Sequence, residues 1–185
     1  VVVEGDLLAM NCKGNKLSTI DCTSSDKLVL LDCSDNQLGQ LDISGLKSAK
    51  YIYFMNNKIT NLILGELPLL EELNASFNGL NSINLTKLLA LKALSVDNNS
   101  ISNLVVDRNT KLEALYCKKN KIQSLDVTML PNLKELSASR NRLSAIDLSK
   151  NTELEELDLK DNSLTDLDFT NNINLSEINV SENKL

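Results

Sequence analysis

The sequence predicts a repeat solenoid that is mostly β, an α/β-type repeat fold in which each short unit stacks on the next. An asparagine recurs every 21 residues without insertion, from Asn15 to Asn183. We start each unit eight residues before its asparagine. The first, fourth, sixth, eleventh, fourteenth and sixteenth positions of the unit are then apolar wherever the chain reaches them. Such a fixed period is typical of stacked units that share one continuous core.

The repeat divides the chain into nine units and a short leading segment. Residues 1–6 are expected to be the remnant of an N-terminal flank, and residues 7–185 the repeat domain. The units begin at residues 7, 28, 49, 70, 91, 112, 133, 154 and 175, and the last unit is incomplete. A solenoid needs capped terminal coils. Because no capping sequence is recognisable, we expect the chain to be an excerpt of a larger protein.

Each unit is expected to begin with a strand. Apolar residues alternate around the fourth to sixth positions, and this period of two indicates a half-buried strand. The asparagine follows at the ninth position, where the chain leaves the strand and turns. Its side-chain amide can pair with backbone groups that the turn would otherwise bury without partners.

The second half of the unit is expected to return in an extended or 3₁₀ conformation. It commonly reads apolar, Asp, apolar, then Ser or Thr, as in Leu41 to Ser44 and Ile146 to Ser149. A unit of 21 residues is too short for a strand, two turns and a full crossover helix. The return segment is therefore not expected to be an α-helix.

This pattern resembles the leucine-rich repeat, and the resemblance covers residues 7–185. The unit length and the cysteines at the sixth position of three units, Cys12, Cys33 and Cys117, resemble the cysteine-bearing, internalin J-like subclass. That subclass also occurs in secreted Bacteroidetes proteins. The resemblance implies a right-handed superhelix with a parallel concave sheet and extended or 3₁₀ convex segments. It also implies a bacterial adhesion module that is secreted or lies at the cell surface.

The cysteines are expected to be packing residues and not nucleophiles. Cys117 precedes two lysines, and a nearby positive charge would lower its thiol pKa. As the sixth residue of its unit, however, Cys117 should point inward while Lys118 points outward. Cys12 and Cys33 occupy equivalent positions on adjacent coils, where parallel side chains are poorly disposed to a disulfide, so we expect free thiols. Cys22, at the sixteenth position, is also expected to point inward.

The composition weighs against several functional classes. The chain contains no histidine, so we expect no catalytic residues, no metal site and no cofactor. The formal net charge of −6 argues against a nucleic-acid partner. No apolar run is long enough to span a membrane, so we expect no direct membrane insertion. We expect a monomer.

Large apolar residues occupy positions that should face outward. The third, fifth, seventh and eighth positions are expected to line the concave face, and all three tyrosines lie there. Units two to four contribute a set that we call the aromatic patch: Leu30, Tyr51, Tyr53, Met55 and Phe77. Tyr116 lies at the same kind of position in the sixth unit. Exposed aromatic and methionine clusters are typical of interface hot spots or of sugar-stacking surfaces. Alternatively, these side chains satisfy strand propensity or pack against an absent segment.

The second half of the concave face is expected to be charged. Glu135, Glu156 and Glu177 occupy the third position of successive units, and we call them the acidic row. Like charges at strand spacing cost stability. Lys134 and Lys160 are expected to compensate the row, and the alternative is a cation or a basic partner.

Basic residues gather where the strands of units six and seven should end. We call this set the basic cluster: Lys118, Lys119, Lys121, Arg140 and Arg142. Opposite charges on one surface can orient a partner and raise its association rate. The alternative is that the cluster only keeps the surface soluble.

The sequence thus predicts a non-enzymatic binding or adhesion module that recognises a protein or a glycan on its concave face. Secretion or display at the cell surface is implied by the resemblance alone. Two alternatives remain open: a structural spacer, and a substrate-docking module of a larger surface protein or enzyme.

Overall fold

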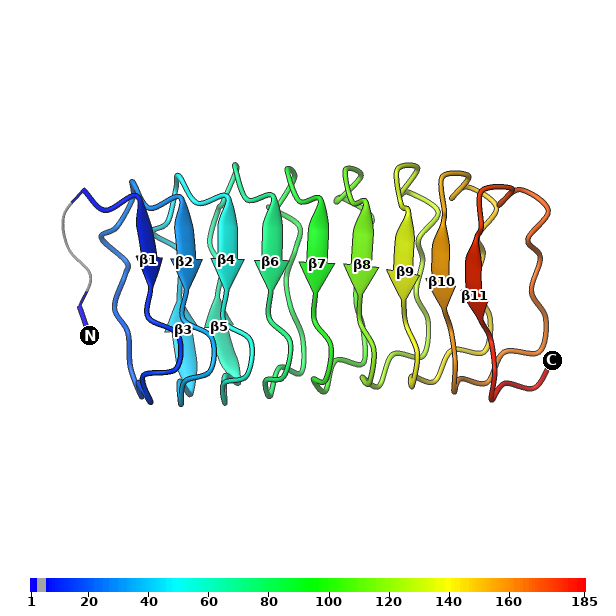
Figure 1. Cartoon of the computed structure of the whole chain (residues 1–185), viewed down its shortest axis with the longest axis horizontal. Helices are drawn as coiled ribbons and strands as arrows, with labels where there is room; N and C mark the ends of the chain where they lie inside the picture. The colour runs from blue at the N-terminus through cyan, green and yellow to red at the C-terminus, as the bar shows by residue number, and fades with distance from the viewer. Residues whose placement is uncertain (3–5) are drawn as a thin grey trace.

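The computed structural model describes residues 1–2 and 6–185 and forms a parallel β-solenoid (Figure 1). Each of the nine units contributes one strand to a sheet with the order β1-β2-β4-β6-β7-β8-β9-β10-β11. The strands of this sheet are β1 (Ala9–Asn11), β2 (Leu30–Asp32), β4 (Tyr51–Tyr53), β6 (Glu72–Asn74), β7 (Ala93–Ser95), β8 (Ala114–Tyr116), β9 (Glu135–Ser137), β10 (Glu156–Asp158) and β11 (Glu177–Asn179). The predicted flank, residues 1–6, includes residues 3–5, which lie outside the described residues.

The register of the sheet equals the repeat period. Leu31 is the Cα partner of Ile52, and Leu94 is the partner of Leu115, so each strand pairs with residues 21 positions along the chain. Every residue of the unit therefore lies beside its equivalent in the next coil. The repeat positions of the sequence become continuous rows in the structure.

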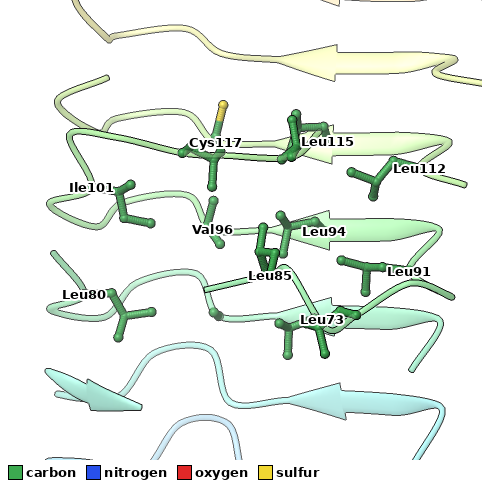
Figure 2. Packing of buried hydrophobic residues seen from close by; sticks show 14 of the residues in the cluster. Leu73, Leu80, Leu85, Leu91, Leu94, Val96, Ile101, Leu112, Leu115 and Cys117 are labelled. Atoms are coloured by element: carbon green, nitrogen blue, oxygen red, sulfur yellow. The ribbon is translucent and has the colours of Figure 1, made fainter. Parts of the chain in front are cut away.

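The core lies between the strands and the return segments. Figure 2 shows Leu94 and Leu115 on neighbouring strands, with Leu85 from a return segment lying beside Leu94 on the side of Leu73. All three are at most 1% exposed. In the interior coils the six apolar positions are buried or half-buried, which confirms the predicted inward set. At the ends the same positions open to solvent, as at Leu7 and Ile178.

The return segments are extended and end in tight turns. In the second and third units they form β3 (Gln40–Asp42) and β5 (Asn61–Ile63), which pair in a separate two-stranded sheet. The turns are closed by backbone bonds such as Leu130 N–H to Val127 O at 3.0 Å. No helix, α or 3₁₀, occurs in residues 1–2 and 6–185, so the extended alternative is the one observed.

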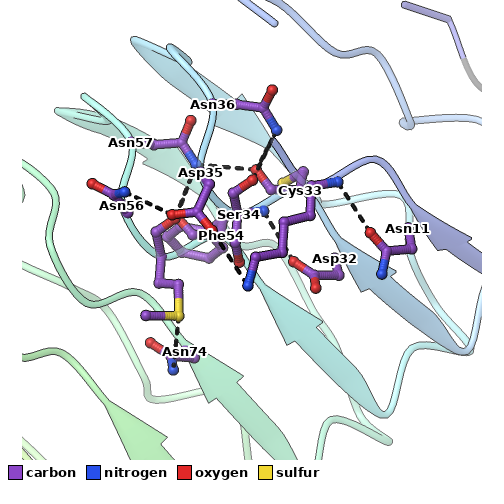
Figure 3. Close-up of polar contacts among 12 residues, drawn as sticks. Asn11, Asp32, Cys33, Ser34, Asp35, Asn36, Phe54, Asn56, Asn57 and Asn74 are labelled. Atoms are coloured by element: carbon purple, nitrogen blue, oxygen red, sulfur yellow. Dashed lines mark hydrogen bonds and ion pairs between the residues drawn. The ribbon is translucent and has the colours of Figure 1, made fainter. Parts of the chain in front are cut away.

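From the second unit on, the asparagine of the unit binds two coils at once (Figure 3). Asn36 Nδ2 donates to Cys33 O at 2.9 Å and Ser34 O at 3.0 Å in its own turn. It also donates to Cys12 O of the preceding coil at 3.0 Å, and its Oδ1 accepts the Leu17 N–H at 2.8 Å. The same pattern recurs in later coils, for example at Asn120 and Asn162. We call this row the asparagine ladder.

A second set of asparagines was not identified from the sequence. Asn109, Asn151 and Asn172, at the nineteenth position, are at most 4% exposed. Asn151 Nδ2 donates to Val127 O and Leu130 O of the preceding coil, both at 2.9 Å. These side chains bind the return segments together where other units carry leucine. Asparagine side chains therefore cross-link neighbouring coils on both sides of the solenoid, at the strand ends and at the return segments.

The residue before each ladder asparagine adopts a left-handed backbone. Its φ lies between 53° and 73° at Gly14, Asp35, Asn56, Phe77, Asn98, Lys119, Arg140, Asp161 and Glu182. This eighth position was expected on the strand. The strands comprise only the third to fifth positions, however, so the eighth residue lies in the turn beyond the strand. A left-handed conformation costs a non-glycine residue about 1–2 kcal/mol, and Phe77 is the one large apolar residue that adopts it here.

The cysteines lie in the core as predicted, and all four are free thiols. Cys117 is fully buried, and burial raises its thiol pKa. Burial likewise raises the pKa of Cys22 to about 11. The lysines that follow Cys117 in the sequence do not activate it.

Removing one side chain of the asparagine ladder should strongly destabilise the fold. In Asn120→Ala the carbonyls of Val96, Cys117 and Lys118 and the N–H of Ile101 lose their partner. We expect the free energy of unfolding to fall by about 2–4 kcal/mol in chemical denaturation. Asn81→Ala, at an exposed position, is the control and should change it by less than about 0.5 kcal/mol. Equal effects of the two substitutions would contradict this role.

Phe77→Asn should not destabilise the protein. Asparagine already occupies the equivalent position at Asn56 and Asn98, and it tolerates the left-handed backbone. We expect the free energy of unfolding to stay within about 0.5 kcal/mol of the wild type or to rise by up to about 1 kcal/mol. A loss of more than about 2 kcal/mol in chemical denaturation would show that the ring packs against the fold.

The buried thiols should make stability fall in alkali. An unfolded cysteine loses its proton near about pH 8.5, whereas burial raises the pKa of folded Cys117. Above about pH 9 the unfolded state therefore binds fewer protons, and the free energy of unfolding should fall by up to about 1.4 kcal/mol per pH unit for this thiol. Denaturation between about pH 8 and 11 should give a shallower decline for Cys117→Val, which copies Val96. Identical slopes would contradict the argument.

Candidate functional site

The outward face of the nine-stranded sheet, which we call the sheet face, holds most of the predicted site residues. Leu30 on β2 is the Cα partner of Tyr51 on β4, and Tyr53 lies two residues further on the same face. All three are half-buried. The structure therefore brings these members of the aromatic patch together on neighbouring strands.

Met55 and Phe77 lie where the strands end. Met55 is half-buried, and its sulfur lies 3.9 Å from Asn74 Nδ2. Phe77 occupies the left-handed turn of the next coil, and 49% of its surface is exposed. The aromatic patch thus extends from the strands onto the adjoining turns. Phe77, which has the most exposed ring of the patch, also has the least favourable backbone conformation.

Tyr53 and Tyr116 are each fixed by a glutamate that the sequence analysis did not identify as a partner. Tyr53 Oη donates to Glu72 Oε2 at 2.9 Å, and Tyr116 Oη donates to Glu135. Partial burial and the hydrogen bond to Glu72 raise the pKa of Tyr53 to about 12. Burial and the bond to Glu135 also raise the pKa of Tyr116. In both pairs the glutamate follows the tyrosine by 19 residues, a spacing that could have revealed them.

The acidic row forms as predicted in the register of the sheet. Glu156 on β10 is the Cα partner of both Glu135 on β9 and Glu177 on β11. The expected compensation by lysines is not observed as ion pairs. Lys134 pairs with Glu155 at 4.0 Å, and Lys160 pairs with Glu182 at 3.1 Å.

Residues of alternating charge occupy the second position of successive units, and this pattern explains why Lys134 pairs with Glu155. The residues from the third to the eighth unit are Lys50, Glu71, Lys92, Glu113, Lys134 and Glu155. Glu71 pairs with Lys92 at 2.8 Å and with Lys50 at 3.4 Å. Such exposed pairs contribute less than about 1 kcal/mol each. These lysines and glutamates nevertheless neutralise one another along this edge of the sheet face. The acidic row beside them therefore gains no partner from these residues.

A hollow in the sheet face lies over β8 to β11. Its lining includes Tyr116, Glu135, Glu156, Asp158 and Glu177. In the residues that the structure describes, no group of three or more Cys, Asp or Glu side chains could hold a metal ion. The metal-ion alternative for the acidic row therefore has no geometric support.

The basic cluster lies beside the hollow. Lys119 and Arg140 occupy left-handed turns after β8 and β9, and both are exposed. Lys118 is half-buried, and its N–H donates to Asp97 Oδ1 at 2.6 Å. Within residues 1–2 and 6–185, no side chain of the cluster forms an ion pair with the acidic row. The basic cluster and the acidic row therefore remain separate along the strand direction.

The described residues contain no helix that is long and apolar enough to cross a membrane. A comparison with protein-family models found no match. A comparison with curated protein sequences also found none.

Solved structures resemble the chain closely. The domain of internalin J from Listeria monocytogenes that includes a cysteine ladder is 27% identical, with a TM-score of 0.85 over 95% of this chain and 44% of that one. A leucine-rich-repeat protein of Leptospira interrogans is 30% identical, with a TM-score of 0.90 over 95% of this chain and 49% of that one. The chain thus spans about half the length of these neighbours or less.

A third neighbour was solved with its ligand. The leucine-rich-repeat ectodomain of a receptor kinase from Arabidopsis thaliana, in complex with Casparian strip integrity factor 2, is 28% identical, with a TM-score of 0.74 over 85% of this chain and 22% of that one. The similarity to these neighbours agrees with three features of the chain: the 21-residue coils, the asparagine ladder and the inward cysteines. The chain is a leucine-rich-repeat solenoid similar to the cysteine-ladder domain of internalin J.

Proposed function

We propose that the chain is a non-enzymatic binding module that docks a partner protein on its sheet face, outside the cell that makes it. The observation that carries the proposal is the aromatic patch. Tyr51 and Tyr53 lie half-buried on the outward face of a sheet whose other face already supplies the core, and Phe77 presents its ring to solvent in the adjoining turn. Large aromatic residues of this kind dominate the energetics of protein interfaces.

The backbone of Phe77 argues against a purely structural role for its ring. The equivalent positions in neighbouring coils carry Asn56 and Asn98, which suit the left-handed turn better. A strained residue with an exposed ring contributes little to folding. Unfavourable backbone conformations cluster at binding sites, where the rest of the fold stabilises them.

The hydrogen bond from Tyr53 to Glu72 supports the same interpretation. It restricts the ring before any partner arrives, so less side-chain freedom is lost on binding. The ligand-bound plant receptor ectodomain is a similar solenoid that holds a ligand, which favours docking over a spacer role. Secretion or display at the cell surface belongs to this proposal, because internalin J is among the structures that the chain resembles.

The test replaces patch residues by those of other coils. In Tyr53→Ser with Phe77→Asn, both new residues already occur at equivalent positions, as in Ser95 and Asn98. The matched control is Leu89→Thr with Met129→Asn, which removes two exposed apolar side chains from the return side. Immobilised wild type, variant and control are exposed to cell-surface protein extracts and to a glycan array.

We expect wild type and control to retain the same protein and the sheet-face variant to lose it, with circular dichroism and thermal unfolding unchanged. Equal retention by all three would favour the spacer and contradict docking on the aromatic patch. Selective loss of a glycan, with no protein retained, would replace the protein partner by a sugar. Retention of a substrate of a neighbouring catalytic domain would favour the substrate-docking alternative.

A further inference from the structure

We infer that Asn78 is a site of spontaneous deamidation, which the asparagine ladder suppresses as long as the turn after β6 stays closed. Asn78 and Gly79 form the one Asn-Gly pair in the sequence. In the other eight units the ladder asparagine is followed by lysine, arginine, glutamine or serine. Asparagine is a thermolabile residue, and it is most labile before glycine, because no side chain shields the next backbone nitrogen. This chemistry does not depend on what the sheet face binds.

The reaction needs only water as a co-reactant. The backbone nitrogen of Gly79 attacks Cγ of Asn78, so that a new N–Cγ bond forms and the Cγ–Nδ2 bond breaks. The proton of the Gly79 nitrogen leaves with Nδ2 as ammonia, and a cyclic imide remains. Water then opens the imide at either of its carbonyls. One product is aspartate, and the other is isoaspartate, in which the main chain runs through the former side chain.

The fold itself favours the reactive pair at this position. The asparagine ladder requires the side-chain amide of Asn78. A Cβ atom on residue 79 would lie 2.9 Å from Thr60 Cγ2 and 3.5 Å from Ile59 O, so the preceding coil leaves little room for a side chain. Two structural requirements therefore place the labile pair inside the ladder.

Hydrogen bonds of the closed turn keep the two reacting groups apart. Asn78 Nδ2 donates to Phe54 O at 3.1 Å and to Ala75 O at 3.2 Å. Asn78 Oδ1 accepts the Ile59 N–H at 3.0 Å, and the Gly79 N–H donates to Ile59 O at 2.9 Å. The side-chain amide must leave these partners before it can turn toward the Gly79 nitrogen. The rate of deamidation in the folded protein should therefore follow the population of the open turn.

Deamidation would prevent the turn from closing again. An aspartate at position 78 has no N–H to donate, so Phe54 O and Ala75 O would lose a donor and face a carboxylate. An isoaspartate would add one carbon to the main chain of the coil, and the residues that follow would leave the 21-residue register. A reversible opening of one coil would thereby become irreversible damage.

The experiment follows deamidation of the full chain in the folded state and in guanidinium chloride, at the same mildly alkaline pH. Peptide mapping by mass spectrometry measures conversion at Asn78, Asn57 and Asn120 in the same sample. An isoaspartyl methyltransferase assay measures the isoaspartate formed. Asn57 and Asn120 are ladder asparagines followed by lysine, so they are internal controls.

In guanidinium chloride we expect Asn78 to convert at least tenfold faster than either control asparagine. In the folded protein, conversion at Asn78 should be at least tenfold slower than in guanidinium chloride. Equal rates at the three asparagines of the unfolded chain would overturn the site. Equal rates at Asn78 in the folded and unfolded chains would overturn its protection by the ladder.

Asn99→Ala tests whether the ladder controls the reaction. Asn99 Nδ2 donates to Ala75 O at 3.0 Å, and its Oδ1 accepts the Leu80 N–H at 3.0 Å, so its loss should loosen the coil that contains Asn78. We expect conversion at Asn78 in the folded state to rise at least threefold in this variant. Asn81→Ala, at an exposed position, is the control and should leave the rate unchanged. An unchanged rate in Asn99→Ala would contradict control by the ladder.

A double variant removes the reactive pair. Thr60→Gly with Gly79→Lys copies Gly39 and Lys58, which occupy the same two positions one coil earlier. After long incubation in guanidinium chloride and dilution, we expect the wild type to lose refolding yield in proportion to conversion at Asn78, and the double variant to keep its yield, as measured by circular dichroism. Deamidated wild-type chains that refold and unfold at the original denaturant midpoint would contradict the damage. The conversion rates in guanidinium chloride test the site whether or not this variant folds.

Discussion

The asparagine ladder is the interaction on which the rest of the structure depends. From Asn36 onward, each ladder side chain satisfies carbonyls of its own turn and of the preceding coil, so it fixes both the turn and the stacking distance. A coil with an extra residue would move its amide away from these carbonyls and leave them buried without partners. This requirement accounts for the constant 21-residue spacing of the nine ladder asparagines. It also explains why Phe77 is held in a left-handed turn, since the bend precedes Asn78 regardless of the residue placed there.

Identical coils place the residues of each repeat position side by side in one row, so the sequence of residues along a row determines its chemistry. At the sixth position this gives buried Cys117 beside Val96, and burial determines the thiol pKa although lysines follow in the sequence. At the second position alternating charge gives paired ions, as at Lys92 and Glu71. At the third position three glutamates in succession give repulsion. The stacking is the same in every row, so the choice of residue alone decides between a neutral edge and a charged one.

The fold could be predicted from the sequence because its determinants are periodic. The inward positions, the strands and the turn asparagines recur in every unit, so one unit predicts the others. Two contacts escaped prediction for different reasons. Tyr53 reaches Glu72 over 19 residues and not over the 21 of the repeat, whereas Lys134 pairs with its neighbour in its own row, Glu155, and not with the acidic row. The left-handed turn at Phe77 was missed because the strand is shorter than its apolar alternation suggests.

Folding and binding use different residues of the same unit, and this separation shapes the site. Core and ladder positions carry the stacking, whereas the third and fifth positions face outward on the strands and the eighth lies in the turn. The seventh position, expected to face outward, is buried at Ser34, Ser76 and Ser139. Phe77 is tolerated at one of these positions despite its backbone cost, because the asparagine ladder holds the turn. Repulsion within Glu135, Glu156 and Glu177 is tolerated for the same reason. Both features are unfavourable in the isolated chain, and the proposed docking on the sheet face accounts for the exposed ring of Phe77 at a position where asparagine would suit the backbone better.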